Sequence, residues 1–544
     1  MANSRTRKRI HDASRPYLDE EEGVSREDVK PASRGRRLYI LRRISGVCIV
    51  GSAALWLILW ISSSANEEWY RRALWGGDVY RRRGLCKGAG SLEEELAGVV
   101  PLEQGAAPSS QTLQQQAQAV APTWRAVLDS LPPSAVIARI RKQMPLSENL
   151  RNGGRPPAWA VEVLQSSLAA WMAAPPPYPA DAFSGRGVVI TGGHLRYWSG
   201  ALAAFASLRK QGCRLPFELW VLEPELPDLP PKIVKHFSDV MGVAVRVLPK
   251  DNLYGAAGYR AKVSAILSSS FEEVLFLDAD NIPLGNACAL FDEPLYKVAG
   301  ALFWKDFWEA VPAEALKAIT RTNASLTNTH ESGQMVIDKR RGWRELLTAA
   351  HINFLGPGIY YPMLSGTTGE GDKETFPYGF LLWGHSFGVI EAGVVRVGRD
   401  GPAGWEGSGM LQHSPAGAPL FLHANAYKPN FLTLPDTIVP TVAHGSKFES
   451  HKQEMQRASG YDVEAFVHAV LRAVRCDEEV ASYVYKELRW RIYWRAIHLK
   501  LMQVLRRARL TSSSNNPTFT SGYIGIRCSY MHNWRVKDPL SCPF

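Results

Sequence analysis

Apolar runs and amphipathic stretches alternate along the chain from residue 187 onward. Short apolar runs bounded by polar residues predict buried strands at 188–191, 217–222, 243–248 and 274–277. Stretches with helical spacing of apolar residues predict helices at 198–211, 232–241 and 259–267. Strands that alternate with helices favour the α/β class, with a mostly parallel sheet and helices on both faces. Ligands of such sheets bind beyond the carboxyl ends of the strands, and Asp278 follows the fourth run directly.

The stretch 44–65 contains no charged residue and is rich in valine, leucine and isoleucine. A helix rises about 1.5 Å per residue, so this stretch can cross a hydrocarbon core of roughly 30 Å, and we predict a transmembrane helix. The alternatives are a signal peptide, disfavoured by the long charged leader, and a buried core helix, disfavoured by the lack of polar periodicity. Arginines precede the span while Glu67 and Glu68 follow it, which favours a single-pass type II topology.

The remaining segments differ in composition. Residues 1–43 are the predicted cytosolic tail, and residues 66–180, with glutamine-rich and proline-rich stretches, are a predicted stem that is partly helical. Part of this stem, 122–174, fits a small helical subdomain packed on the head equally well. Residues 181–455 form the predicted head domain, and residues 456–544 form a predicted C-terminal helical extension.

The formal net charge is +11, with the basic excess mainly at the two ends of the chain. Nucleic-acid binding would need a basic face on a recognisable binding module, which the sequence lacks. The charge therefore indicates a membrane surface or anionic substrates. Residues 492–505 have one apolar helical face, so this helix either packs on the head or contacts anionic lipid headgroups.

Of seven cysteines, Cys48 lies in the predicted span and the others lie outside it. Their wide spacing shows no zinc pattern, and it is compatible with disulfides of unknown connectivity in an oxidising compartment. Asn323-Ala324-Ser325 is a lone glycosylation acceptor triplet.

Asp278-Ala279-Asp280 follows four apolar residues at the end of the fourth predicted strand. Two alternate carboxylates can turn toward one cation where the backbone bends, and hard ions such as Mn²⁺ or Mg²⁺ prefer oxygen ligands. Such an ion stabilises the charge that develops on a diphosphate leaving group. Taken alone, so short a pattern fits a solvated strand-end turn better than a metal site.

The context favours the metal site, because four segments in order resemble the yeast-type Golgi α-mannosyltransferases, which build α-1,2 and α-1,3 mannose branches. The segments are 259–284, 331–337, 371–376 and 421–429. More broadly they resemble GT-A glycosyltransferases with glycogenin-like motifs. The resemblance covers roughly residues 185–435, and it implies that the head is a Rossmann-like GT-A catalytic domain.

The resemblance also implies the residues of a donor and metal site. Asp278 would contact the ribose or the metal, Asp280 would bind the metal, and His423 would be the third protein ligand. Lys428 would hold the diphosphate as a point charge. Two further basic side chains from the preceding helix would assist, Arg260 and Lys262. A solvated surface role is the alternative for each basic residue.

Further residues would surround the reacting sugar. Ser332 and Gly333 belong to an expected turn before a strand that lines the donor sugar. Asp372 would orient the acceptor or steady an oxocarbenium-like centre, with Glu374 as the second choice; a capping or surface role is the alternative for both. Several tryptophans either stack on sugars or belong to the core: Trp304, Trp308, Trp383 and Trp405.

The resulting hypothesis is a metal-dependent, retaining glycosyltransferase that moves mannose from GDP-mannose onto a glycan or glycoprotein. Its expected cofactor is Mn²⁺ or Mg²⁺, and its expected location is the Golgi membrane, with the catalytic domain in the lumen. Two alternatives remain open from the sequence. One is a transferase that uses a UDP-sugar, and the other is a catalytically silent, membrane-anchored glycan-binding protein.

Overall fold

The computed structural model describes most of the chain between residues 86 and 484. The described residues are 86, 89–96, 110–144, 156–249, 258–311, 313–322, 326–365, 367, 369–401, 404–431 and 446–484. No helix within these residues is long and apolar enough to cross a membrane. The predicted span and tail, the glycosylation triplet and the apolar helical face at 492–505 all lie outside the described residues.

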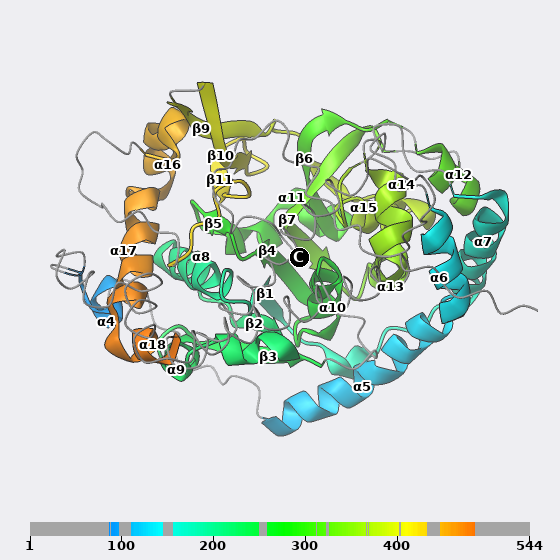
Figure 1. The fold of residues 1–544 in the computed structure, drawn as a ribbon, viewed down its shortest axis with the longest axis horizontal. Helices are drawn as coiled ribbons and strands as arrows, with labels where there is room; N and C mark the ends of the chain where they lie inside the picture. Colours follow the sequence, from blue (N-terminus) through cyan, green and yellow to red (C-terminus); the bar gives the residue numbers. More distant parts are fainter. Residues whose placement is uncertain are drawn as a thin grey trace, which may run out of the picture. The chain divides into compact units, whose positions relative to one another are not determined.

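A seven-stranded mixed sheet lies at the centre of the described residues (Figure 1). Its strands, in spatial order, are β3 (Val243–Leu248), β2 (Phe217–Leu222), β1 (Arg186–Thr191), β4 (Glu273–Asp278), β7 (Asn328–Asp338), β6 (Ala301–Glu309) and β8 (Gly388–Ile390). The strands β1 to β4 pair in parallel, whereas β7 runs antiparallel to both of its neighbours. The four predicted strands and the mostly parallel pairing are confirmed, whereas the antiparallel strand β7, which makes the sheet mixed, was not predicted.

A second, antiparallel sheet lies beside the first and was not predicted from the sequence. Its strands, in spatial order, are β5 (Asn281–Pro283), β11 (Pro419–His423), β10 (Gly404–His413) and β9 (Val395–Gly401). Only two residues, Ala279 and Asp280, lie between the end of β4 and the start of β5, so the chain passes directly from one sheet into the other.

Helices cover both faces of the large sheet. Three of them were predicted: α8 (Trp198–Lys210), α9 (Pro231–Asp239) and α10 (Arg260–Ser268). The others are α4 (Leu92–Glu95), α5 (Ser110–Asp129), α6 (Ser134–Gln143), α7 (Ala158–Ala173), α11 (Pro294–Ala299), α12 (Glu314–Thr320), α13 (Trp343–Leu355), α14 (Tyr361–Leu364), α15 (Thr375–Leu382), α16 (Lys452–Ser459), α17 (Val463–Cys476) and α18 (Glu478–Tyr483). The central four residues of β1 and of β4 are all buried, as expected for strands covered on both sides.

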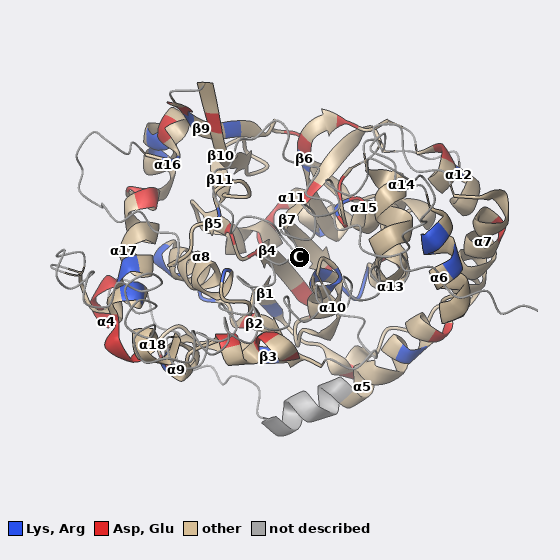
Figure 2. Ribbon diagram, in the orientation of Figure 1, with Lys and Arg blue, Asp and Glu red and all other residues tan. Residues whose placement is uncertain are grey.

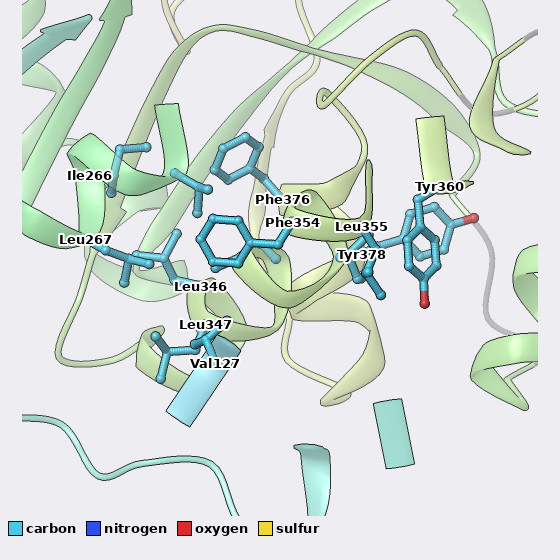
Figure 3. Close-up of a cluster of buried hydrophobic side chains, with 14 of the residues drawn as sticks. Val127, Ile266, Leu267, Leu346, Leu347, Phe354, Leu355, Tyr360, Phe376 and Tyr378 are labelled. Carbon is cyan, nitrogen blue, oxygen red and sulfur yellow. The ribbon is translucent and has the colours of Figure 1, made fainter. Parts of the chain in front are cut away.

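The described parts of the segment 122–174, residues 122–144 and 156–174, pack on the head, as one of the two alternatives from the sequence has it. Val127 of α5 belongs to the same buried cluster as Leu267 of α10 and Leu347 of α13 (Figure 3). The indole N–H of Trp171, on α7, donates to Thr348 Oγ1 on α13 over 3.2 Å. These helices therefore share the hydrophobic core of the head.

Helices α16 to α18 also pack against the head. Gln211, at the end of α8, donates from Nε2 to the carbonyl of Ser459 over 2.9 Å. Two disulfides join distant parts of the chain, Cys86–Cys476 and Cys213–Cys288. The first links the segment before α4 to the end of α17, a connectivity that cysteine spacing alone did not reveal.

A buried histidine joins α13 to the helices of the 122–174 segment. His351 Nδ1 lies 2.9 Å from Ser130 Oγ, and His351 Nε2 lies 3.5 Å from Ser167 Oγ. The ring also stacks on Trp171 with a centroid distance of 5.8 Å. Burial lowers the pKa of His351 to about 3, because the charged imidazolium is poorly solvated there.

We expect the protein to lose stability as the pH falls from about 6.5 toward about 3, because the unfolded chain binds a proton at His351 and the folded chain does not. The slope from one such proton is about 1.4 kcal/mol per pH unit. Urea unfolding at several pH values measures it. His351→Gln should remove this slope, whereas His451→Gln, at an exposed histidine, should keep it. Equal slopes in both variants would contradict the assignment.

Candidate active site

The two predicted aspartates lie where the large sheet passes into the small one. Asp278 is the last residue of β4, and Asp280 directly precedes β5. Strand β11 pairs antiparallel with β5, so that His423 lies opposite Asn281. The backbone N–H of Ala424 donates to the carbonyl of Asp280 over 2.9 Å. Strand pairing therefore brings His423 beside aspartates that are far away in the sequence.

Asp278, Asp280 and His423 form one cluster. His423 Nε2 lies 3.3 Å from Asp280 Oδ1 and 3.8 Å from Asp278 Oδ2. One ligand atom from each residue lies within 4.8 Å of the other two. Carboxylate and imidazole are both common ligands of divalent metals. The donor set and its spacing therefore fit a single divalent cation.

Two lysines neutralise the carboxylates of the cluster, and Figure 2 shows charged positions of both signs around β4 and β7. Lys262 Nζ donates to Asp278 Oδ2 over 2.9 Å and to Ser332 Oγ over 3.0 Å. Lys428 Nζ donates to Asp280 Oδ2. Both lysines, predicted as donor-binding residues, therefore lie in the cluster.

The charges of the cluster control one another's protonation. Burial by itself raises the pKa of Asp280, but Lys428 and His423 outweigh this and hold that pKa far below its usual range. Burial lowers the pKa of His423, yet Glu331 and Asp280 more than offset this and raise it. Burial likewise opposes the charge of Lys428, and Asp280 reverses the effect and raises its pKa. The metal-free cluster is thus a compact ion-pair network.

The segment 331–334 differs from its expected conformation. It is not a turn before a strand but part of β7, which runs without interruption from Asn328 to Asp338. The antiparallel pairing of β7 with β4 continues to Leu277 opposite Gln334, and this places Ser332 and Gly333 beside the end of β4. Both residues therefore reach the predicted site, although by sheet pairing instead of a turn.

Gly333 is required by the close approach of His423. A Cβ at this position would lie 2.5 Å from Cε1 and Nδ1 of the His423 ring. Atoms in a packed interior do not approach so closely, so any side chain here would displace the imidazole. The role of Gly333 is therefore to admit the ring into the cluster.

Asp372 lies across the cluster, on the segment before α15. It is 2% exposed, and its Oδ2 has no hydrogen-bond partner within the described part of the chain. Lys262 Nζ is its nearest cation, at 3.8 Å. Burial raises the pKa of Asp372 to about 6, with Lys262 acting in the opposite direction. This buried and under-satisfied carboxyl group adjoins Asp278 through the shared Lys262.

Glu374 has a different position from the one expected for a reacting carboxylate. Its Oε1 accepts from the backbone N–H of His330 over 2.5 Å, and its Oε2 lies 3.0 Å from His330 Nδ1. Both oxygens are thus engaged with β7. Glu374 is 1% exposed and its side chain makes no helix-capping hydrogen bond, so it has neither the surface role nor the capping role considered from the sequence. Its catalytic role stays a prediction.

Arg260 has different neighbouring groups from Lys262. The charged or titratable groups that influence its pKa, besides burial, are Tyr361 and Arg141, and burial lowers that pKa. Lys262, two residues further along α10, faces the carboxylates instead. The two basic residues predicted to act together thus have different surroundings.

Two residues of the site were not predicted from the sequence. Glu331 Oε1 lies 3.5 Å from His423 Nδ1 and accepts from the backbone N–H of Gly333 over 2.9 Å. Asn281 Nδ2 donates to the carbonyl of Gly333 over 2.8 Å, which ties β5 to β7. Each is adjacent in sequence to a predicted site residue, so proximity to the motifs was an available signal.

The sequence of the head is similar to a family model and to several curated proteins. Residues 185–328 and 318–414 match the family model described as "Mannosyltransferase putative". The α-1,2-mannosyltransferase MNN21 of Candida albicans is 27% identical over 412 residues, which is 57% of this chain and 60% of that protein. MNN2 of Saccharomyces cerevisiae, also an α-1,2-mannosyltransferase, is 27% identical over 280 residues, 43% of this chain and 46% of its own. The chain thus spans about half the length of these curated relatives.

Solved structures of glycosyltransferases are similar at a lower level. GlyE of Streptococcus pneumoniae has a TM-score of 0.26 and 17% identity, over 38% of this chain and 45% of its own. The galactosyltransferase LgtC has a TM-score of 0.23 and 13% identity, over 33% of this chain and 69% of its own. Such scores carry no argument about mechanism.

The family match and the sequence relatives agree with each other. The match begins just before β1 and ends after β10, so it contains both aspartates of the cluster. The resemblance predicted from the sequence is therefore confirmed: over residues 185–414 this chain is similar to the yeast-type α-1,2-mannosyltransferases, a family of glycosyltransferases.

Proposed function

We propose that the chain is a metal-dependent, retaining α-mannosyltransferase that transfers mannose from GDP-mannose to a glycan or glycoprotein acceptor. The observation that carries this proposal is the convergence of Asp278, Asp280 and His423 within 4.8 Å at the edge of the sheet. The names of the relatives support the mannosyl group. The GT-A assignment agrees with ligand binding beyond the carboxyl ends of parallel strands.

The three proposed metal ligands and the two lysines would have different roles in binding the donor diphosphate. Asp278, Asp280 and His423 would hold Mn²⁺ or Mg²⁺, which when bound stabilises negative charge on the departing diphosphate. Lys428, paired with Asp280 in the cluster, would turn its ammonium toward the diphosphate as a second positive charge. Lys262 would keep Asp278 in place through its hydrogen bond.

Asp372 would act on the sugar side of the reaction. Its carboxyl group is buried, and it has Lys262 as a neighbour in common with Asp278. A carboxylate there can orient an acceptor hydroxyl or stabilise an oxocarbenium-like centre by its charge. Ser332, which is held by Lys262, and Gly333 would line the adjoining donor pocket.

The same proposal includes the cellular setting. The stretch 44–65 would anchor the chain in the Golgi membrane as a type II protein, with the stem and the catalytic domain in the lumen. The disulfides Cys86–Cys476 and Cys213–Cys288 support an oxidising compartment for the described residues.

Donor hydrolysis tests the proposed function. The full-length chain, solubilised in detergent, is incubated with GDP-mannose or a panel of UDP-sugars, with and without Mn²⁺, and the released nucleotide is measured. We expect release from GDP-mannose that depends on the metal. If nucleotide is released from a UDP-sugar and not from GDP-mannose, the proposed donor is wrong. If no donor gives nucleotide release or sugar transfer, the protein is instead a glycan-binding protein without turnover.

A further inference from the structure

One tryptophan of the four considered from the sequence is largely exposed near the site. Trp308, on β6, is 70% exposed, the highest value among the aromatic side chains of the described residues. Trp304 is fully buried and donates to the carbonyl of His413, and Trp383 donates to Thr348 inside the helical core. Trp405 is 40% exposed and belongs to the second sheet. The exposed indole of Trp308 is therefore accessible to a ligand from solvent.

The backbone around Trp308 is held firmly. Thr329 Oγ1 donates to the carbonyl of Trp308 over 2.8 Å. The N–H of Ala310 donates to Thr327 over 3.2 Å, and the N–H of Val311 donates to Thr367 over 3.0 Å. An aromatic side chain on an ordered backbone has few rotatable bonds, so it loses little conformational entropy when a ligand binds to it. This mounting distinguishes Trp308 from a side chain on a loose loop.

Strand β6 leads from Trp308 to the proposed reacting centre. Trp304 pairs with Glu331 of β7, whose carboxylate lies 3.5 Å from His423 Nδ1. Trp308 follows Trp304 by four positions along the strand, which corresponds to at most roughly 13 Å. A second connection runs through Asp306, which forms a buried ion pair with Lys373, the neighbour of Asp372. Trp308 is therefore fixed relative to the cluster but does not belong to it.

The chemistry around Trp308 fits a sugar ring. The C–H face of a pyranose is apolar and packs on an aromatic plane, while its hydroxyl groups need polar partners. Glu309, the next residue of β6, is also exposed, and a carboxylate can accept from such hydroxyls. Val311, 57% exposed, extends the apolar surface. The exposed residues Trp308, Glu309 and Val311 thus offer apolar and hydrogen-bonding groups of the kinds that a carbohydrate contacts.

We propose that Trp308 forms an acceptor subsite, on which a sugar unit of the acceptor glycan stacks at a distance from the hydroxyl that reacts. This inference rests on the proposed transferase function and adds to it the recognition of acceptor length. A single sugar bound at the reacting centre does not reach Trp308. A longer oligosaccharide does, and its additional contact lowers the acceptor KM.

The experiment compares mannose oligosaccharides of one to four units as acceptors for the wild-type chain and for Trp308→Ala, Trp308→Phe and Trp405→Ala. We expect the wild-type KM to fall by about 2- to 10-fold as the acceptor lengthens, because this is the gain in affinity that one aromatic contact gives. Trp308→Ala should lose this gain and keep its KM for the single sugar and its rate of donor hydrolysis. Trp308→Phe should keep part of the gain, and Trp405→Ala all of it.

An unchanged length dependence in Trp308→Ala would overturn the subsite, as would an equal loss for the single sugar and the tetrasaccharide. Failure of the proposed function is distinguishable, because the wild-type chain would then release no nucleotide from any donor. Saturation-transfer NMR with mannotetraose gives a readout that needs no turnover. Signal in the wild-type chain that disappears in Trp308→Ala supports the subsite, and equal signal in both contradicts it.

Discussion

Asp280→Asn lowers the rate of mannosyl transfer by about 10²- to 10³-fold or more, which is the usual loss when an electrostatic stabiliser of the transition state is removed. Asp280 accepts from Lys428 and lies 3.3 Å from His423 Nε2, so its carboxylate is the link between the proposed metal and the basic side chains. The neutral amide has nearly the same shape and should leave the fold intact. Initial rates with saturating donor and a Mn²⁺ titration measure the effect.

Asp239→Asn is the matched control for this substitution. Asp239 pairs with Lys235 on the surface of α9, and surface ion pairs contribute little to stability. This variant should therefore keep wild-type activity, and the thermal unfolding of both variants should resemble that of the wild-type chain. If Asp280→Asn retained wild-type activity and metal dependence, the proposed metal site would be wrong.

His423→Ala raises the Mn²⁺ concentration needed for half-maximal activity by about 10- to 100-fold or more, since changes to the surroundings of a metal ligand alone have effects of this size. Asp278 and Asp280 remain as ligands, so excess metal should restore part of the rate. Electron paramagnetic resonance of free Mn²⁺ measures the affinity without any turnover.

Lys428→Ala separates the role of the metal from the role of the lysine. This variant should raise the donor KM or lower kcat, because a positive charge near the diphosphate is lost. Its Mn²⁺ affinity should not fall, because Lys428 is not a metal ligand. In the metal-free cluster it donates a hydrogen bond to the Asp280 carboxylate and so competes with the metal. Equal loss of Mn²⁺ affinity in the Lys428 and His423 variants would contradict this division of roles.

The affinity for Mn²⁺ should also fall as the pH decreases. Burial opposes the protonation of His423, but Glu331 and Asp280 raise its pKa above the ordinary value, so a proton competes with the metal already near neutral pH. The loss in the wild-type chain should thus begin above about pH 6.5. In His423→Ala this part of the pH dependence should be absent.

The parallel half of the large sheet was predictable from local sequence. A strand buried on both faces is typically a continuous apolar run; such runs lie in β1 and β4, and β2 has one from Leu219 to Leu222 after the buried Glu218. The helices α8 and α10 were predictable from the helical spacing of their apolar residues. The position of Asp278 at a strand end followed directly from these strands.

The antiparallel parts were not predictable in the same way. Strand β10 contains three glycines, and β5 has only three residues, so neither shows a clear apolar run or alternation. In β7 the polar residues Glu331, Ser332 and Gln334 are buried by the neighbouring site, and their pattern resembles a turn. Hydrogen bonds to partners from other elements, such as Lys262 and Asn281, compensate for this burial.

The sequence by itself determined the apolar runs of the parallel strands, the carboxylate pair at the end of β4 and, through family resemblance, the identity of His423 as a candidate ligand. Only the tertiary structure decided that β11 pairs with β5, that Lys262 faces the carboxylates while Arg260 does not, and that Glu374 binds His330. The physical reason is the separation along the sequence of the residues that interact. Periodicity and strand ends depend on neighbours along the chain, whereas ligand geometry, ion pairing and pKa depend on groups that strand pairing and burial bring together from distant segments.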